Sequence, residues 1–158
     1  MLYLDSSVFF KNYVQETGSD AIAARIEQEK HSAATPFTSV ISYAEIHAVF
    51  ARKKRERHLS SQELTRLQLR FNRDWAFATG AIELIAGVQG YIPQIVSDAP
   101  LKGSDAIHLA SALWLRGAAR IGMFGESGNL CFATSDVRLA AAASARGLIV
   151  FNPETDPG

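Results

Sequence analysis

The sequence predicts an α/β layer fold with a mainly parallel sheet. Short apolar runs that suit buried strands alternate along the chain with longer segments in which apolar residues recur at helical spacing. With 158 residues, the chain is long enough for one domain that buries about two-thirds of its unfolded surface. The expected strands are residues 1–4, 81–86, 130–133 and 148–151.

Three helices are expected between the first two strands. The first, over residues 21–27, is preceded by Gly-Ser-Asp, which suits a capped helix start. Thr38 or Ser39 is expected to cap the second, which runs into the charged stretch 52–58. The third opens with Ser-Ser-Gln-Glu at 60–63, which has the form of a capping box. Its apolar side chains recur at helical spacing and are interpreted as core residues: Leu64, Leu67, Phe71 and Trp75.

Two further helices are expected before the last strand. A helix over about residues 105–115 precedes a glycine-rich segment, 122–129. An alanine-rich helix follows over residues 136–147, and its closing Gly147 suits a left-handed helix cap. We therefore expect a single domain over residues 1–153 and a short C-terminal tail, 154–158.

The composition is typical of a globular cytoplasmic protein. Apolar residues make up 47% of the chain and charged residues 20%, and no run approaches the roughly 18 apolar residues of a membrane span. No charged leader precedes the first strand, so we expect neither a secretory signal nor a membrane anchor. Cys131 is the single cysteine and is interpreted as a small core residue in a reducing cytosol.

The formal net charge is zero, because 16 basic residues balance 16 acidic ones. The whole molecule therefore has no electrostatic preference for nucleic acid, and any such partner must be held by local charge. The densest local charge is the stretch 52–58, which suits RNA, a protein partner or only solvent at a helix end. Arg138 is a second candidate for contact with phosphate.

Four acidic side chains stand where the chain should be apolar: Asp5, Glu45, Asp105 and Asp136. A carboxylate in apolar surroundings is costly unless it is paired, hydrogen-bonded or bound to a metal. Asp5 and Asp136 follow expected strands, at the edge of a parallel sheet where ligands bind. If the fold brings the four together, their repulsion makes a divalent cation the natural partner. Oxygen ligands favour Mg²⁺ or Mn²⁺ over zinc.

Each acid also has a purely structural interpretation. Asp5, Asp105 and Asp136 suit helix starts, where a carboxylate interacts favourably with the helix dipole. Glu45 is harder to explain in this way, because it shares a helical face with Ile41, Ala48 and Val49, which we expect to be buried. The lone histidines His47 and His108 are interpreted as packed or surface residues rather than as ligands.

Other catalytic classes lack support in the sequence. The chain has no P-loop, no G-x-G-x-x-G and no G-x-S-x-G motif. A phosphatase that works through a phosphorylated Asp5 would want a second aspartate two residues later, where Ser7 stands.

Four segments resemble, in order, the acidic motifs of PIN-domain proteins, and most closely those of VapC-type toxins of toxin–antitoxin pairs. They are residues 3–7, 43–46, 104–110 and 133–139, and residues 147–153 resemble the last strand of that family. The resemblance implies a three-layer α/β/α fold and a Mg²⁺-dependent ribonuclease, with Mn²⁺ as a possible substitute. It also implies an RNA substrate, a cognate antitoxin protein and a homodimer.

Carried over by position, the resemblance implies an acidic quartet of metal ligands, with Thr134 and Ser6 as supporting hydroxyls; the quartet is Asp5, Glu45, Asp105 and Asp136. The hypothesis is therefore a metal-dependent endoribonuclease, the toxin of a toxin–antitoxin pair. The alternatives are a catalytically weak binding or regulatory module of the same fold and, further off, a small-molecule phosphatase.

Overall fold

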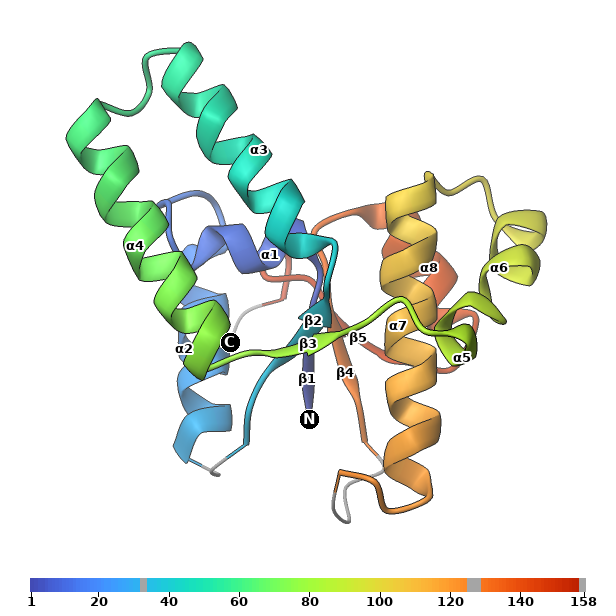
Figure 1. Ribbon diagram of the computed structural model, residues 1–158. Helices are drawn as coiled ribbons and strands as arrows, with labels where there is room; N and C mark the ends of the chain where they lie inside the picture. Colours follow the sequence, from blue (N-terminus) through green and yellow to red (C-terminus); the bar gives the residue numbers. More distant parts are fainter. Residues whose placement is uncertain (32–33, 125–128, 157–158) are drawn as a thin grey trace.

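The computed structural model describes residues 1–31, 34–124 and 129–156. Its centre is a five-stranded sheet in which every pairing is parallel, with the strand order β3-β2-β1-β4-β5 (Figure 1). The strands are β1 (Leu2–Leu4), β2 (Phe37–Ser39), β3 (Gly80–Ile82), β4 (Cys131–Ala133) and β5 (Ile149–Phe151). The predicted α/β fold with a parallel sheet is confirmed, and the carboxyl ends of all the strands lie at one edge.

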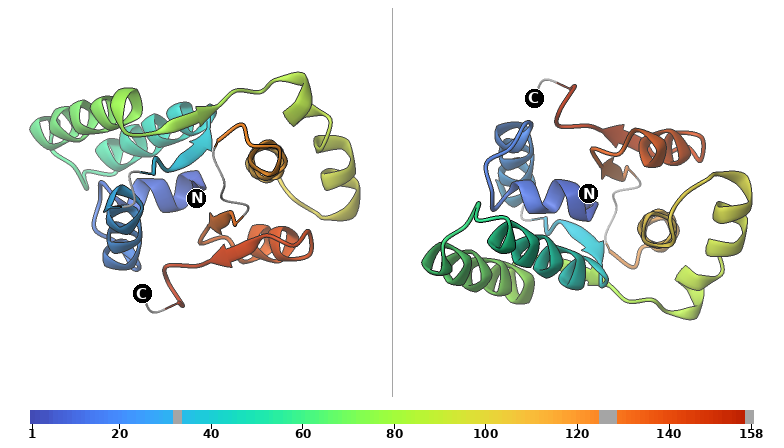
Figure 2. Two further views of the ribbon diagram at one scale, coloured as in Figure 1. Left: turned by 90° about the horizontal axis from the view of Figure 1, so that it is seen from below. Right: turned by 90° about the horizontal axis from the view of Figure 1, so that it is seen from above.

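The helices of the described residues form two layers, one on each face of the sheet (Figures 1 and 2). The first layer contains α1 (Ser6–Lys11), α2 (Ser19–His31), α3 (Ser42–Arg55) and α4 (Ser61–Phe77). The second contains α5 (Ala86–Gln89), α6 (Ile92–Asp98), α7 (Gly103–Arg120) and α8 (Val137–Ser144). The three-layer α/β/α arrangement is therefore confirmed.

The central strand β1 divides the core into two clusters. Leu2 and Leu4 pack with the first helical layer, whereas Tyr3, between them, packs with the second. All three side chains are fully buried, because β1 has a strand on each side and a helical layer on each face. This explains why an uninterrupted apolar run, rather than an alternating one, marks the strand in the sequence.

Several predicted helix signals are confirmed. Ser60 caps α4 and forms a capping box with Glu63, and Phe71 on the same helix is fully buried. Asp136 caps α8, and Gly147 has φ of 72°, the left-handed conformation expected of it. Cys131 is buried in the core, as expected of a small apolar filler.

The predicted cap at Thr38 or Ser39 is wrong, because both residues belong to strand β2. The Thr38 hydroxyl donates to the Leu4 carbonyl oxygen at 2.6 Å and also bonds the Ser42 hydroxyl at 2.6 Å. Helix α3 starts only at Ser42, and Ile41 precedes it without a side-chain cap. Strand β2 has three residues, two of them polar, so it lacks the apolar run by which a buried strand is identified from the sequence.

The strand predicted at 81–86 is also too long, since β3 ends at Ile82 and α5 and α6 follow it. Helix α7 extends from Gly103 to Arg120, well beyond the predicted 105–115. Within the described residues, no helix is long and apolar enough to span a membrane. Residues 125–128 of the glycine-rich segment and 157–158 of the tail lie outside the described residues.

Candidate active site

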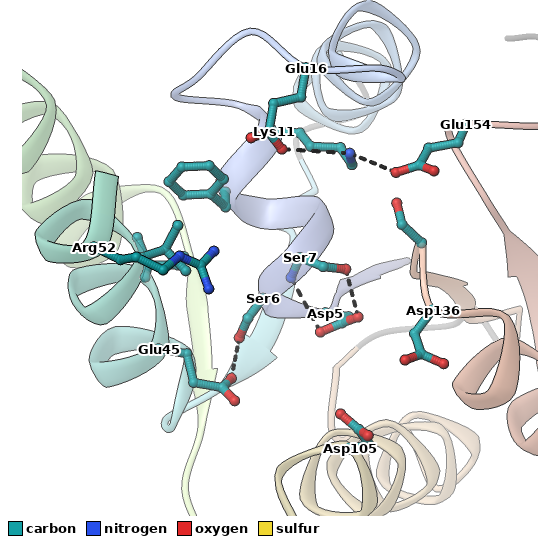
Figure 3. Close-up of a pocket in the computed structure, with 14 residues that line it drawn as sticks. Asp5, Ser6, Ser7, Lys11, Glu16, Glu45, Arg52, Asp105, Asp136 and Glu154 are labelled. Carbon is teal, nitrogen blue, oxygen red and sulfur yellow. Dashed lines mark hydrogen bonds and ion pairs between the residues drawn. The ribbon is translucent and has the colours of Figure 1, made fainter. Parts of the chain in front are cut away.

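The four predicted acids meet in one pocket at the carboxyl edge of the sheet (Figure 3). Asp5 directly follows β1, and Asp136 lies three residues beyond β4. Glu45 and Asp105 stand in the first turns of α3 and α7, which cover opposite faces of the sheet. The parallel sheet thus brings together carboxylates from four separate segments, and Ser6 lines the same pocket.

Asp5 is the most firmly held of the four acids. It is 7% exposed, and its Oδ2 accepts hydrogen bonds from the Thr134 hydroxyl at 2.7 Å and the Ser7 hydroxyl at 2.9 Å. Its Oδ1 accepts the Ser7 backbone N–H at 3.4 Å, so Asp5 is also the cap of α1. These donors offset the cost of burying the carboxylate and fix its direction.

Thr134 lies behind the pocket rather than on its surface. Its side chain is fully buried, and besides donating to Asp5 its hydroxyl accepts the backbone N–H of Asp136 at 3.1 Å. One hydroxyl therefore connects two of the acids. Thr134 therefore holds Asp5 from behind the pocket.

Asp136 and Asp105 face the pocket from two helix starts. Asp136 Oδ1 accepts the backbone N–H groups of Arg138 at 2.8 Å and Leu139 at 3.0 Å, while Arg138 Nη2 lies 3.8 Å from Oδ2. Among the residues that the structure describes, Asp105 accepts a hydrogen bond only from the Lys102 backbone N–H, at 3.3 Å. Burial raises the pKa of Asp105, and the nearby charges of Asp136 and Asp5 raise it further.

Glu45 approaches the pocket from the other side, held by Ser6 and His108. Its Oε2 accepts a hydrogen bond from the Ser6 hydroxyl and lies 3.0 Å from His108 Nε2. Burial raises the pKa of Glu45, but the hydrogen bonds from His108 and Ser6, with the attraction of His108, outweigh it and lower the pKa. The carboxylate form is therefore favoured.

The helical face assigned to Glu45 needs correction. The buried stripe of α3 is Ser42, Ile46 and Phe50, not Ile41, Ala48 and Val49. The Glu45 side chain lies beside this stripe and remains 33% exposed at the pocket. The expected residue is thus in the site, but it lines an opening instead of the core.

The interpretation of His108 as a merely packed residue is also incomplete. The ring is 1% exposed, yet it bonds to two pocket residues, Ser6 and Glu45. The sequence signal that could have revealed it is its spacing of three residues from Asp105, which places both on one face of α7. His47, by contrast, packs among aromatic rings on α3 and α4 and bonds Asn72 at 3.3 Å.

Two cations also line the pocket among the described residues, and their surroundings differ. Lys11 is 6% exposed, with Nζ 2.8 Å from Glu154 Oε1 and 2.9 Å from the Thr17 carbonyl oxygen. Its charge is therefore satisfied within the fold. Arg52 extends from α3 toward the pocket without an ion-pair partner among the residues that the structure describes (Figure 3).

The four carboxylates share the pocket without forming a closed ligand cluster. Among the described residues, no group of three or more His, Cys, Asp or Glu side chains is close enough to hold a single metal ion. The donor set nevertheless suits a hard cation, since it consists of carboxylate and hydroxyl oxygens. The pKa of Asp105 is raised first by burial and then by the charges of Asp136 and Asp5, and a bound cation would relieve that repulsion.

Comparison with known proteins places this geometry in a family. Residues 2–145 match the family model described as the PIN domain. The chain is 32% identical over 157 residues to Ribonuclease VapC45 and to Ribonuclease VapC49 of Mycobacterium tuberculosis, and each match covers 99% of both chains. The crystal structure of VapBC2 from Rickettsia felis, bound to a DNA fragment from its promoter, shares the fold with a TM-score of 0.66 at 13% identity. That match covers 96% of this chain and 98% of the Rickettsia chain. The chain therefore belongs to the PIN-domain family and, within it, to the VapC type.

Proposed function

We propose that this protein is a metal-dependent endoribonuclease that acts as the toxin of a toxin–antitoxin pair. The proposal depends above all on one observation, the convergence of four carboxylates from four separate segments on a single pocket. The relatives named as ribonucleases match the chain over nearly its whole length, which supports the same activity here.

The carboxylates would hold Mg²⁺ or Mn²⁺, with Asp5 and Asp105 as the main ligands and Glu45 and Asp136 contributing directly or through water. When bound, such an ion stabilises negative charge on the phosphate and favours ionisation of the attacking water. Because no three acids among the described residues lie close enough together to hold one ion, we expect the more exposed side chains to move when the metal binds. Asp5 is held by Thr134 and Ser7 and would keep its position.

The remaining residues of the pocket would orient the reactants. Attack by water, rather than by the ribose 2′-hydroxyl, gives a 5′-phosphate and a 3′-hydroxyl as products. Ser6 and His108 fix Glu45 at one wall, and Thr134 fixes Asp5 and the start of the segment that carries Asp136. These residues would thus orient charges around a scissile phosphodiester.

Arg52 is the residue we assign to the RNA phosphates. Of the basic stretch 52–58, it is the member that lines the pocket, because it lies on the same side of α3 as Glu45, two turns further along. The next two cations of the stretch already have partners. Lys53 Nζ lies 2.6 Å from Glu16 Oε1, and Lys54 Nζ donates to the Ser61 hydroxyl at 2.7 Å. A guanidinium that has no ion-pair partner within the described part of the chain, next to an acidic pocket, is suited to a bidentate phosphate contact.

A cognate antitoxin and a homodimer are further parts of the proposal. The structural neighbour is VapBC2 bound to promoter DNA, which supports an antitoxin partner for this chain. A short reading frame beside the gene, whose product co-purifies with this chain and blocks cleavage, is the expected result. Light scattering on the purified chain measures whether it is a dimer.

Cleavage of labelled RNA with and without EDTA tests the activity. We expect 5′-phosphate products with Mg²⁺ or Mn²⁺, no cleavage with EDTA, and loss of cleavage in Asp5→Asn and Glu45→Gln. Asp5→Asn is preferable to an alanine variant, because Asp5 also caps α1. Metal-independent cleavage, or full activity in both variants, would contradict the proposal. RNA binding without cleavage by the metal-loaded protein would favour a binding module.

A further inference from the structure

A chain of hydrogen bonds runs from the core of the protein to the pocket through His108. The Tyr3 hydroxyl lies 3.1 Å from His108 Nδ1, and His108 Nε2 lies 3.0 Å from Glu45 Oε2. Nε2 is also 3.0 Å from the Ser6 hydroxyl and 3.8 Å from Asp5 Oδ1. The ring therefore stands between two of the four acids, on the buried side of the pocket.

The contacts of the ring decide where its proton lies. A carboxylate oxygen is an acceptor only, so an Nε2 lone pair facing Glu45 Oε2 would be repelled at this distance. Nε2 must therefore carry hydrogen and donate to Glu45. In the neutral ring Nδ1 is then an acceptor, and the Tyr3 hydroxyl is its donor. If the ring is charged, Nδ1 donates to Tyr3 and the bond to Glu45 is the same.

Tyr3 is fixed strongly enough to determine this arrangement. It is fully buried in the central strand, and its ring stacks on Phe132 with centroids 5.3 Å apart. His108 is fixed by α7, three residues after Asp105. Since Tyr3 and His108 are both buried, water does not compete for the ring nitrogens, and the direction of the Nε2–H bond is fixed by the fold.

We propose that His108 is a positioning residue that holds the Glu45 carboxylate in its metal-binding orientation, and that Tyr3 fixes the proton of the ring for this task. The inference rests on the proposed function. The Glu45 side chain is 33% exposed, so without the donor it could turn away from the pocket. Groups that orient metal ligands typically contribute about 10- to 100-fold to metal affinity or activity.

The test compares three variants with a matched control. His108→Leu removes the donor, His108→Gln retains an N–H that can reach Glu45, and Tyr3→Phe removes only the hydroxyl. His47→Leu, a histidine on α3 outside the pocket, is the control. Calorimetric titration with Mn²⁺ measures metal affinity without any need for cleavage. The RNase assay gives kcat and KM separately, and circular dichroism reports the fold.

We expect His108→Leu to weaken Mn²⁺ binding and lower kcat by about 10- to 100-fold with KM for RNA unchanged. His108→Gln should recover most of the loss. Tyr3→Phe should cost about 2- to 10-fold, since it removes one neutral hydrogen bond. His47→Leu should match the wild type.

Two failures can be told apart. If the wild type binds Mn²⁺ and cleaves RNA, but a folded His108→Leu behaves like His47→Leu, the positioning role is wrong and the nuclease remains. If His108→Leu does not fold, Tyr3→Phe decides, and wild-type affinity and kcat in that variant overturn the inference. A wild type that never cleaves RNA with any divalent ion overturns the proposed function itself.

Discussion

Replacing Thr134 by valine removes one hydroxyl while retaining the shape of a fully buried side chain. That hydroxyl donates to Asp5 Oδ2 at 2.7 Å and accepts the Asp136 backbone N–H at 3.1 Å. A hydrogen bond to a charged acceptor contributes about 1.5–3 kcal/mol, and an N–H left without a partner costs about 1–3 kcal/mol. We therefore expect Thr134→Val to lower the free energy of unfolding by about 3 kcal/mol.

Thr38→Val is a matched control within the same sheet. Thr38 is also fully buried, but its hydroxyl bonds only neutral groups, the Leu4 carbonyl oxygen and the Ser42 hydroxyl. The expected loss is about 1–2 kcal/mol. Urea unfolding of both variants and the wild type gives the two losses directly, and the slope with urea should not change.

The two valine variants should differ more in activity than in stability. Thr134→Val frees the Asp5 carboxylate from its shortest hydrogen bond, so kcat should fall about 10-fold or more. Thr38→Val should keep kcat near the wild-type value under conditions in which both proteins are folded. Equal losses of stability and equal kcat values in the two variants would show that the bond to Asp5 has no special role.

Four further outcomes follow from the charges of the pocket. Mn²⁺ at 100 times its Kd should add about 2.7 kcal/mol to the free energy of unfolding. The melting temperature should then rise by about 5–11 °C, and an unchanged melting temperature would count against the metal site. Asp105→Asn should stabilise the metal-free protein at neutral pH, because a raised pKa makes ionisation of Asp105 unfavourable to the fold. The gain should vanish below the ordinary value of 3.8, as urea unfolding across pH would show. Glu45→Gln should instead lower the free energy of unfolding at neutral pH, because a lowered pKa means that the ionised Glu45 stabilises the fold. This difference from the wild type should disappear in acid, where Glu45 is protonated. Arg52→Gln should raise KM for RNA with little change in kcat. It should also reduce the slope of log affinity against log salt by about 0.7, whereas the control Arg66→Gln on α4 should leave KM and the slope unchanged.

Strands β1 and β4 were predictable because they are buried on both faces, and each appears in the sequence as an apolar run. The edge strand β5 is also an apolar run, although its Ile149 is 57% exposed. β2 could not be found in this way, since two of its three residues are polar and fully or nearly fully buried. Thr38 is accommodated there by bonds to Leu4 and Ser42, contacts that only the assembled fold provides.

The same distinction applies to the site. The positions of Asp5 and Asp136 were predictable, because carboxylates that follow strands of a parallel sheet collect at one edge. Glu45 and Asp105 lie in helices, and only the family resemblance implied that they join the same site. The hydrogen bonds that hold the acids in place were not predictable. The bond from Thr134 to Asp5 spans 129 positions of the chain, and that from His108 to Glu45 spans 63. The contacts themselves leave no local pattern in the sequence, and for His108 only its spacing from Asp105 indicated that it shares a helical face with a predicted acid.

The hydrogen bonds also rank the acids by how much each depends on a cation. Among the described residues, Asp5, Glu45 and Asp136 each accept two or more bonds from nearby donors, whereas Asp105 accepts a single backbone N–H at 3.3 Å. Burial raises the pKa of Asp105, and the charges of Asp136 and Asp5 raise it further. The fold has therefore stabilised three carboxylates by itself and left the fourth with charge that its own donors do not offset. A hard cation in this pocket would gain most from Asp105, which lies across the pocket from the firmly held Asp5, and these two would set its position.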